Sequence, residues 1–136
     1  MAWLTALFAA LSIAQAQTSP ETVIYSFAVN PRGANPLAPL TRDASGNLFG
    51  TTSQGGQQNL GLVFKLDSSG KQTVLHSFLG GTDGANPYSG LLRTSNGVLY
   101  GTTYAGGTSN AGIIYKVEPS GQESVIYTFT GFGDGG

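Results

Sequence analysis

The sequence predicts an all-β fold, built from tandem repeats of a four-stranded antiparallel unit in the manner of β-propeller blades. Three observations support this prediction. The chain repeats with a period of 51 residues, turn-forming residues separate β-branched and aromatic runs, and no segment after residue 16 has helical periodicity. Four short strands in a unit of this length are typical of a propeller blade, whereas a sandwich has no reason to repeat at a fixed period. A sandwich-like or irregular β array is the alternative.

The repeat can be read directly in the sequence. "LFGTT" at 48–52 returns as "LYGTT" at 99–103, and "GANP" at 33–36 returns at 84–87. Sliding the chain by 51 residues aligns 22–72 with 73–123 without a gap, and 22 of the 51 aligned positions are identical. The predicted organisation is a strand at 17–29 that closes a preceding blade, a first repeat at 30–80, a second at 81–130 and the start of a third at 131–136.

Each repeat is predicted to contain four strands joined by hairpins. In the second repeat, Asn96-Gly97 and the run 119–121 supply turn residues between apolar runs. The predicted strands lie near 39–42, 47–52, 61–67 and 71–78 in the first repeat, and near 90–93, 98–103, 112–118 and 122–129 in the second.

Residues 1–16 are predicted to be a secretory signal peptide. The run 2–14 is apolar, and Ala14-Gln15-Ala16 has the small-x-small pattern of a cleavage site, which places cleavage after Ala16. The run is shorter than the roughly 20 residues that a membrane-spanning helix needs. No Lys or Arg precedes it, so an amphipathic or buried N-terminal helix is the alternative. We therefore expect a secreted or cell-surface protein whose mature chain does not span the membrane.

Composition argues against several functions. Only 10% of the residues are charged, the formal net charge is −1, and the six Lys and Arg residues are scattered, so no basic patch for nucleic acid is expected. The absence of cysteine excludes disulfides and zinc–thiolate sites. The single histidine, His76, aligns with Tyr25 and Tyr127 on a predicted strand and is interpreted as a packing residue. No catalytic residue, cofactor or metal is predicted, because one histidine supplies too few ligands for a histidine-based site.

The carboxylates and glycines are interpreted structurally. Asp67 and Glu118 each stand two residues after a lysine, Lys65 or Lys116, and are predicted to form exposed ion pairs. Asp83, in the loop after a fourth strand, is predicted to serve a turn rather than calcium. The Gly-Thr-Thr runs lack the Lys-Ser/Thr ending and the following helix of a phosphate-binding loop.

Aromatic residues in the loops are the remaining functional signal. Tyr88, Tyr104 and Phe132 fall in or beside loops, where their rings could stack on sugars, and they are the speculative ligand-binding residues. The aromatic residues of the predicted strands are assigned to the core: Phe27, Phe49, Phe64, Phe78, Tyr100, Tyr115 and Phe129.

The repeat unit resembles the Gloeobacter–Verrucomicrobia-type ("GloVer") tandem repeat of choice-of-anchor bacterial surface proteins. The residues that carry the resemblance are Asn86-Pro87, the run 99–103, Gly106-Gly107 and Tyr115-Lys116. The resemblance implies an exported protein of many units, often tethered by a C-terminal sorting signal, with no catalytic residues to transfer. The chain departs from this pattern because it contains two complete units and ends in "GFGDGG" without an anchor.

The resulting hypothesis is an exported, non-enzymatic repeat protein that serves as a structural or ligand-binding surface module of a bacterium. Two blades leave two apolar faces uncovered, which favours either a piece of a longer chain or a ring assembled from copies. The expected partners are other repeats, copies of the chain and extracellular glycans. The alternatives are a fragment of an extracellular hydrolase or lyase with its active site elsewhere, and a small lectin assembled from two-blade chains.

Overall fold

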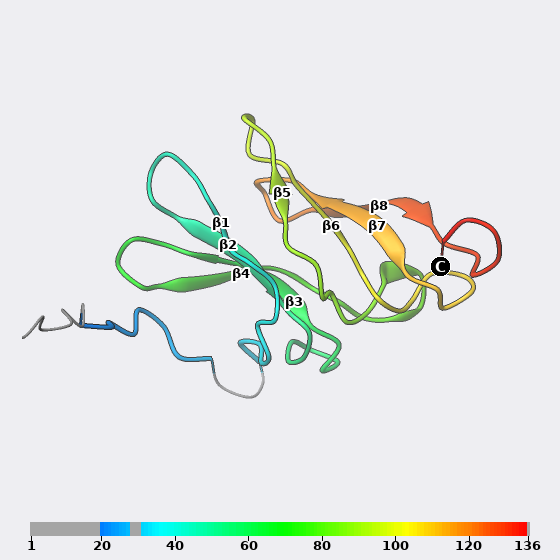
Figure 1. Ribbon diagram of the computed structural model, residues 1–136, viewed down its shortest axis with the longest axis horizontal. Helices are drawn as coiled ribbons and strands as arrows, with labels where there is room; N and C mark the ends of the chain where they lie inside the picture. Colours follow the sequence, from blue (N-terminus) through cyan, green and yellow to red (C-terminus); the bar gives the residue numbers. More distant parts are fainter. Residues whose placement is uncertain (1–19, 28–30, 136) are drawn as a thin grey trace, which may run out of the picture.

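The structure, a computed structural model, describes residues 20–27 and 31–135. Two four-stranded antiparallel sheets follow one another along the chain (Figure 1). Their strand orders are β1-β2-β3-β4 and β5-β6-β7-β8, so each strand pairs with its neighbours in sequence. The prediction of an all-β chain with four antiparallel strands in each repeat is therefore confirmed. The predicted signal peptide at 1–16 lies outside the described residues.

All eight predicted strands are present, and each is at most two residues shorter at either end than predicted. The first sheet contains β1 (Thr41–Arg42), β2 (Leu48–Thr52), β3 (Leu62–Leu66) and β4 (Gln72–Ser77). The second sheet contains β5 (Leu92–Arg93), β6 (Leu99–Thr102), β7 (Ile113–Val117) and β8 (Glu123–Thr128). A 3₁₀ turn, η1 (Gly81–Asp83), connects the sheets and is the only helical element among the described residues.

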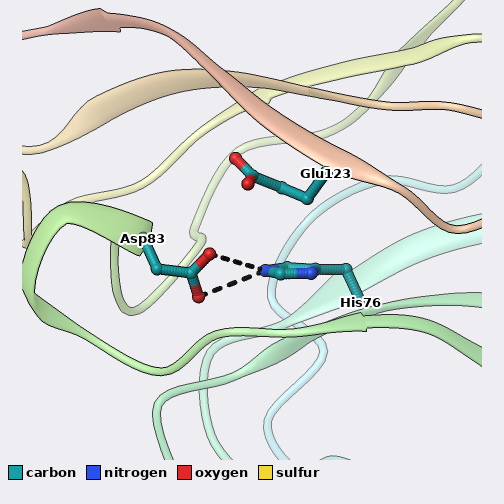
Figure 2. Close-up of side chains that lie close together, drawn as sticks. All are labelled: His76, Asp83 and Glu123. Carbon is teal, nitrogen blue, oxygen red and sulfur yellow. Dashed lines mark hydrogen bonds and ion pairs between the residues drawn. The ribbon is translucent and has the colours of Figure 1, made fainter.

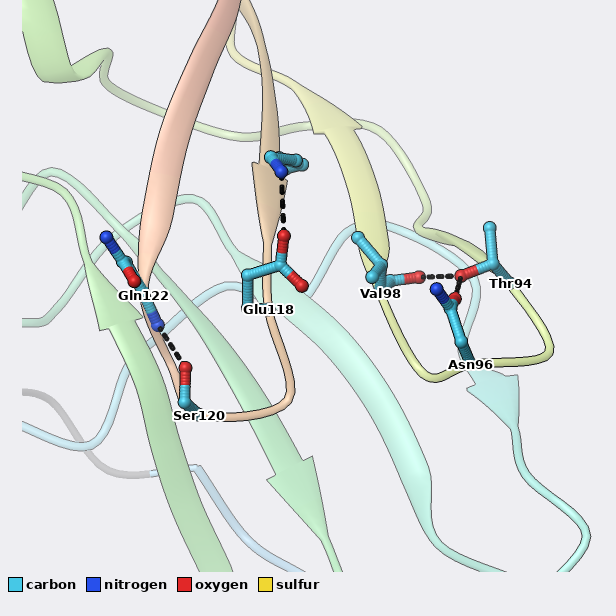
Figure 3. A network of polar contacts seen from close by, with 7 residues as sticks. Thr94, Asn96, Val98, Glu118, Ser120 and Gln122 are labelled. Atoms are coloured by element: carbon cyan, nitrogen blue, oxygen red, sulfur yellow. Dashed lines mark hydrogen bonds and ion pairs between the residues drawn. The ribbon is translucent and has the colours of Figure 1, made fainter.

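The hairpin turns follow one pattern. The backbone N–H of Gly97 donates to the Thr94 carbonyl and the Thr94 N–H donates to the Val98 carbonyl, and equivalent bonds close the turn at 118–122. Side chains reinforce both turns (Figure 3). Gly97 has a φ of 90°, whereas Asn96 does not have a positive φ, so the turn is a three-residue loop ending in a glycine bulge. The Asn-Gly pair predicted the hairpin, and only its glycine needs the left-handed backbone.

The repeated "GANP" and Gly-Gly motifs lie in two loops of each repeat that cross and touch at their backbones. We call these two loops the crossed loops. In the second repeat, Ala85 and Ala105 form an isolated antiparallel bridge. The adjacent Gly84 and Gly106 meet backbone to backbone, and the Gly106 N–H donates to the Asn110 side chain over 2.9 Å. The first repeat contains the same bridge and the same hydrogen bond. These motifs therefore recur because each unit closes its loops by one contact that leaves no room for a side chain.

The glycine of "LYGTT" lies under an aromatic ring of the neighbouring strand. Gly101 pairs with Tyr115, and a Cβ on Gly101 would lie 2.6 Å from the ring carbon Cζ of Tyr115. In the first repeat, Gly50 pairs with Phe64, and its Cβ would lie 2.8 Å from the Phe64 Cζ. Glycine is therefore required in these strands because it permits this close approach.

Replacing Tyr115 with phenylalanine is expected to raise the free energy of unfolding by about 1 kcal/mol, because a buried unpaired hydroxyl costs roughly 1–3 kcal/mol. Tyr115 is fully buried, and its hydroxyl has no hydrogen-bond partner in the described part of the chain. Burial raises the pKa of this hydroxyl. Urea unfolding followed by circular dichroism measures the change, with the half-buried Tyr100→Phe as control. A loss of stability would show that the Tyr115 hydroxyl has a partner.

The largest apolar core connects the two sheets. Phe49, Val63 and Phe78 of the first repeat pack with residues of the second, namely Leu91, Leu99, Ile113, Tyr115 and Val117. Val63, Phe78 and Tyr115 have no solvent exposure. We call this contact the junction. It holds the two sheets together. The arrangement of the sheets as propeller blades and their closure into a ring are not seen in residues 20–27 and 31–135 and stay predictions.

Residues 20–27 lie against the other face of the first sheet. Residues 20–27 form no ladder with the first sheet, and the strand predicted at 17–29, which would pair with strands of a preceding repeat, stays a prediction. The side chains nevertheless pack in the expected place: Tyr25 and Phe27 contact the cluster of Leu62, Phe64 and Leu66. Phe27 meets Phe64 edge to face at 5.1 Å, as Phe78 meets Tyr115 at 5.0 Å. The segment therefore packs like the fourth strand of a repeat without being hydrogen-bonded as one.

Four of the seven aromatic residues assigned to the core are buried: Phe49, Phe64, Phe78 and Tyr115. Phe27, Tyr100 and Phe129 are half-buried. Each of these three lies beyond the junction, where the described residues cover the ring only in part.

Candidate functional site

A cluster of three titratable side chains lies at the polar edge of the junction. His76 comes from β4 of the first repeat, Asp83 from η1 between the repeats, and Glu123 from the start of β8 in the second repeat (Figure 2). One ligand atom from each residue lies within 4.8 Å of the others. We call these three residues the junction cluster. They belong to three different segments, so only the packing of one repeat on the next brings them together.

A register shift in the first sheet positions His76. The pairing of β3 with β4 shifts register between Val63 and Phe64, so Val63 pairs with His76 while Phe64 pairs with Val74. The extra residue interrupts strand alternation, so His76 does not share the face of Val74, as regular alternation along the strand would require. The His76 ring packs edge to face against Phe78 at 4.8 Å, which agrees with its predicted packing role.

Asp83 is held by the loop in which it lies. The Leu79 N–H donates to the Asp83 Oδ2 over 2.7 Å. In the following loop the Thr130 N–H donates to the Asp134 Oδ2 over 2.8 Å, at the positions one period later. The predicted turn role of Asp83 is therefore confirmed, and the same side chain also reaches the histidine. The His76 Nε2 lies 3.2 Å from both Oδ1 and Oδ2 of Asp83.

Glu123 completes the cluster with an unpaired carboxylate oxygen. Its Oε1 is shielded from solvent and has no hydrogen-bond partner among the described residues. Burial, and then the negative charge of Asp83, raise the pKa of Glu123 from 4.5 to about 7. The side chains of His76 and Asp83 are only 16% and 22% exposed. The cluster thus places two carboxylates and an imidazole, all of them metal-ligating groups, in a partly dehydrated space.

The contact between residues 20–27 and the first sheet has different chemistry at the equivalent positions. We call this contact the first junction, and the contact between the two sheets is then the second. One period earlier, the cluster residues correspond to Tyr25, Arg32 and Gln72. The Tyr25 hydroxyl donates to the Gln72 Oε1 over 2.8 Å, and the Gln72 Nε2 donates to the Arg32 carbonyl over 2.9 Å. These groups satisfy one another without a carboxylate. All three members of the junction cluster therefore depart from the repeat.

Sequence reasoning missed the junction cluster because it weighed the single histidine and the carboxylates separately. The carboxylates that complete it are 7 and 47 positions from His76, and no motif spacing links them. The available signal was that His76, Asp83 and Glu123 all differ from the first repeat at positions that a junction brings together. Using it required knowing that the fourth strand of one repeat packs on the next repeat.

The structure brings together two of the three predicted ligand-binding aromatic residues. The rings of Tyr88 and Tyr104 lie 5.6 Å apart, edge to face, with 47% and 74% of the residues exposed. Phe132 lies in the loop after β8, is 93% exposed, and belongs to none of the aromatic pairs among the described residues.

One of the two predicted ion pairs is present. Lys116 Nζ lies 2.7 Å from Glu118 Oε1. The other prediction is wrong, because Asp67 Oδ1 accepts hydrogen bonds from the backbone N–H groups of Ser69 and Lys71 and from the Ser69 hydroxyl instead. These contacts lower the pKa of Asp67, the Ser69 hydroxyl having the largest effect.

The fold and the junction define an all-β tandem-repeat protein whose units pack on one another. Residues 10–136 match the Gloeobacter/Verrucomicrobia repeat, and the chain belongs to this family, as the sequence resemblance indicated. No similar curated protein and no similar solved structure was found. Across the described ranges, no helix has the length and apolarity needed to cross a membrane.

Replacing Glu123 with glutamine is expected to stabilise the metal-free chain more at pH 8 than at pH 5. The folded-state pKa of about 7 lies above the unfolded value of 4.5, so the contribution of Glu123 to stability is present below pH 4.5 and is lost as pH rises through 7. Allowing for solvent screening, the difference is about 1 kcal/mol. His76 and Asp83 face this carboxylate and are kept in both proteins.

Urea unfolding with a chelator at each pH measures this difference. Glu118→Gln is the control, because Glu118 pairs with Lys116 and lies outside the junction cluster. A difference between the Glu123→Gln and parent proteins that stays constant from pH 5 to pH 8 would contradict a raised pKa for Glu123.

Proposed function

We propose that the chain is an exported, non-enzymatic surface module that works by stacking repeats, with each unit covering an apolar face of the next. The observation that carries this proposal is a difference in burial between equivalent residues. Val63 is fully buried and Phe49 nearly so, both against the second repeat. Their equivalents one period later, Ile114 and Tyr100, are only half-buried.

The same difference extends to the last strands. Leu75 of β4 packs against the junction core, whereas its equivalent Ile126 in β8 is 51% exposed. We define the open face as Tyr100, Ile114 and Ile126. It has the residue types of a covered face, and exposed apolar patches of this kind mark interaction sites. A further repeat, from a longer chain or a second copy, is the partner that fits it.

The opposite end of the molecule supports the proposal. Residues 20–27 cover the first sheet only in part, because an apolar cavity of about 380 Å³ remains between them and the sheet. Its lining includes Phe27, Leu40 and Phe64. Strands of a neighbouring repeat would fill this space, since stacked sheets pack about 10 Å apart without gaps.

The solution mass of the chain tests the proposal. We expect β-rich oligomers by light scattering on a size-exclusion column, and we expect Ile126→Asp to abolish association while keeping the circular dichroism spectrum. The Asp side chain would have to lose its water on stacking, whereas in the single chain position 126 is half exposed. Tyr104→Ser, which removes an exposed ring outside the open face, should not change the mass. A folded monomer for the parent chain at high concentration would refute stacking between copies. A chain extended by one more repeat that is no more stable to urea than the parent would refute stacking within one chain.

A second candidate function is binding of extracellular glycans at Tyr88 and Tyr104. The specific observation is that these two exposed rings lie together, and tyrosine offers a large, rigid contact area at low entropic cost. The first repeat has Leu37 and Ser53 at these positions. Nuclear magnetic resonance titration with soluble oligosaccharides should shift the tyrosine signals, and Tyr88→Leu with Tyr104→Ser should remove the binding. Binding that survives both changes would place the ligand elsewhere.

A further inference from the structure

We propose that His76, Asp83 and Glu123 bind a divalent transition-metal ion, with Zn²⁺ as the probe, and that this ion links the two repeats across the junction. This goes beyond the stacking function, which the apolar contacts carry by themselves. It also replaces the expectation of a metal-free chain that followed from counting histidines.

The distances within the junction cluster suit a small cation. A tetrahedral zinc site with ligands at about 2.0–2.1 Å keeps its ligand atoms roughly 3.3 Å apart. The His76 Nε2 lies 3.2 Å from the carboxylate oxygens of Asp83, and the Glu123 carboxylate lies within 4.8 Å of both residues. All three ligand atoms point into one space in Figure 2.

A second observation comes from the unpaired oxygen of Glu123. Its Oε1 is shielded from solvent and accepts no hydrogen bond from the described residues, although it faces a second carboxylate. A buried carboxylate of this kind requires a proton or a cation.

The comparison between junctions shows that the cluster is not needed for packing. At the first junction, Tyr25 and Gln72 satisfy each other and a backbone carbonyl. At the second, an imidazole and two carboxylates stand in the same places, although the aromatic contact beneath them has the same geometry. The second junction therefore carries ionisable side chains that packing does not require, because the first junction is closed by uncharged groups.

The donor types indicate the class of ion. An imidazole nitrogen suits zinc and other first-row transition metals, whereas calcium prefers six to eight oxygen ligands. Three protein ligands leave one tetrahedral position for water. The ion would join β4, η1 and β8, and it would stabilise the folded chain because the unfolded chain does not assemble the three ligands.

Isothermal titration of Zn²⁺ into chelator-stripped protein without a histidine tag tests the proposal. We expect one Zn²⁺ per chain, a higher thermal unfolding midpoint in excess Zn²⁺, and a shift of the single histidine's imidazole resonances. Glu123→Gln should weaken binding roughly 100-fold or more, because changes to residues that merely orient metal ligands already cost about 10- to 100-fold. Glu118→Gln should leave the affinity unchanged.

The combination of His76→Tyr with Glu123→Gln restores the pair found at the first junction. It should keep the circular dichroism spectrum and lose Zn²⁺ binding, which separates loss of the site from loss of the fold. Three results would overturn the proposal: no saturable Zn²⁺ binding to the parent, binding that persists in this double variant, or binding of Ca²⁺ with none of Zn²⁺.

Discussion

Replacing Phe78 with alanine should lower the free energy of unfolding by about 3–5 kcal/mol, the range for deleting a large core aromatic side chain. Phe78 is fully buried and meets Tyr115 of the second repeat edge to face at 5.0 Å. It also belongs to the core that joins the two sheets. The cavity left by the ring would open at the junction, where neither sheet can collapse without losing its contact with the other.

The repeat supplies a matched control for this substitution. Phe129 is the equivalent residue one period later and is only half-buried, since no further repeat among the described residues covers it. Phe129→Ala should therefore cost about 1 kcal/mol, in keeping with partial burial of the ring. Urea unfolding followed by circular dichroism gives both values. Equal losses for the two variants would mean that the junction adds nothing to the stability of a single repeat.

The eight strands could be predicted from the sequence because their signals are local and occur twice. Turn residues such as Gly97 mark each hairpin, and the 51-residue period allows each repeat to confirm the other. The bounds differ by at most two residues because the strand ends open into loops. Strand pairing also followed from the sequence, because consecutive antiparallel strands joined by short turns must lie side by side.

Two kinds of feature were not predictable from the sequence: a register shift caused by one extra residue in a strand, and the choice of hydrogen-bond partner by a single side chain. The register shift in β4 has no sequence signal, yet it decides where His76 lies. Lys65–Asp67 and Lys116–Glu118 have the same spacing, but only the second forms an ion pair. A serine follows two residues after each carboxylate, Ser69 or Ser120, but the short Asp67 side chain bonds within its own turn, whereas the longer Glu118 side chain reaches its lysine.

The junction cluster required knowledge of how repeats pack. His76 and Glu123 lie on the fourth strands of different repeats, and the sequence does not state that one fourth strand lies against the next sheet. The proximity of Tyr88 and Tyr104 arises within one repeat, since the crossed loops of the second repeat bring their segments together. Pairs of positions that depart together from a repeat are therefore the features to inspect once its packing is known.

Replacing Gly106 with alanine should lower the free energy of unfolding by about 3 kcal/mol or more, because overpacking and backbone strain each cost roughly 1–3 kcal/mol. Gly106 has a φ of 89°, which L-residues rarely adopt. A Cβ there would meet the Gly84 Cα and would lie 2.8 Å from its carbonyl carbon and 3.0 Å from the Gly81 carbonyl oxygen. These are backbone atoms, so no side-chain rotation can relieve the contact.

A second glycine separates the two causes. Gly133 has a φ of 84°, but a Cβ there would have no heavy atom within 4 Å. Gly133→Ala should therefore show only the backbone strain, about 1 kcal/mol, and Gly106→Ala should exceed it by the cost of separating the crossed loops. Urea unfolding of both variants measures that excess. If the two losses are equal, the Gly-Gly pair recurs only for its backbone conformation; an excess shows that it also recurs because one loop must pass against the other at the backbone.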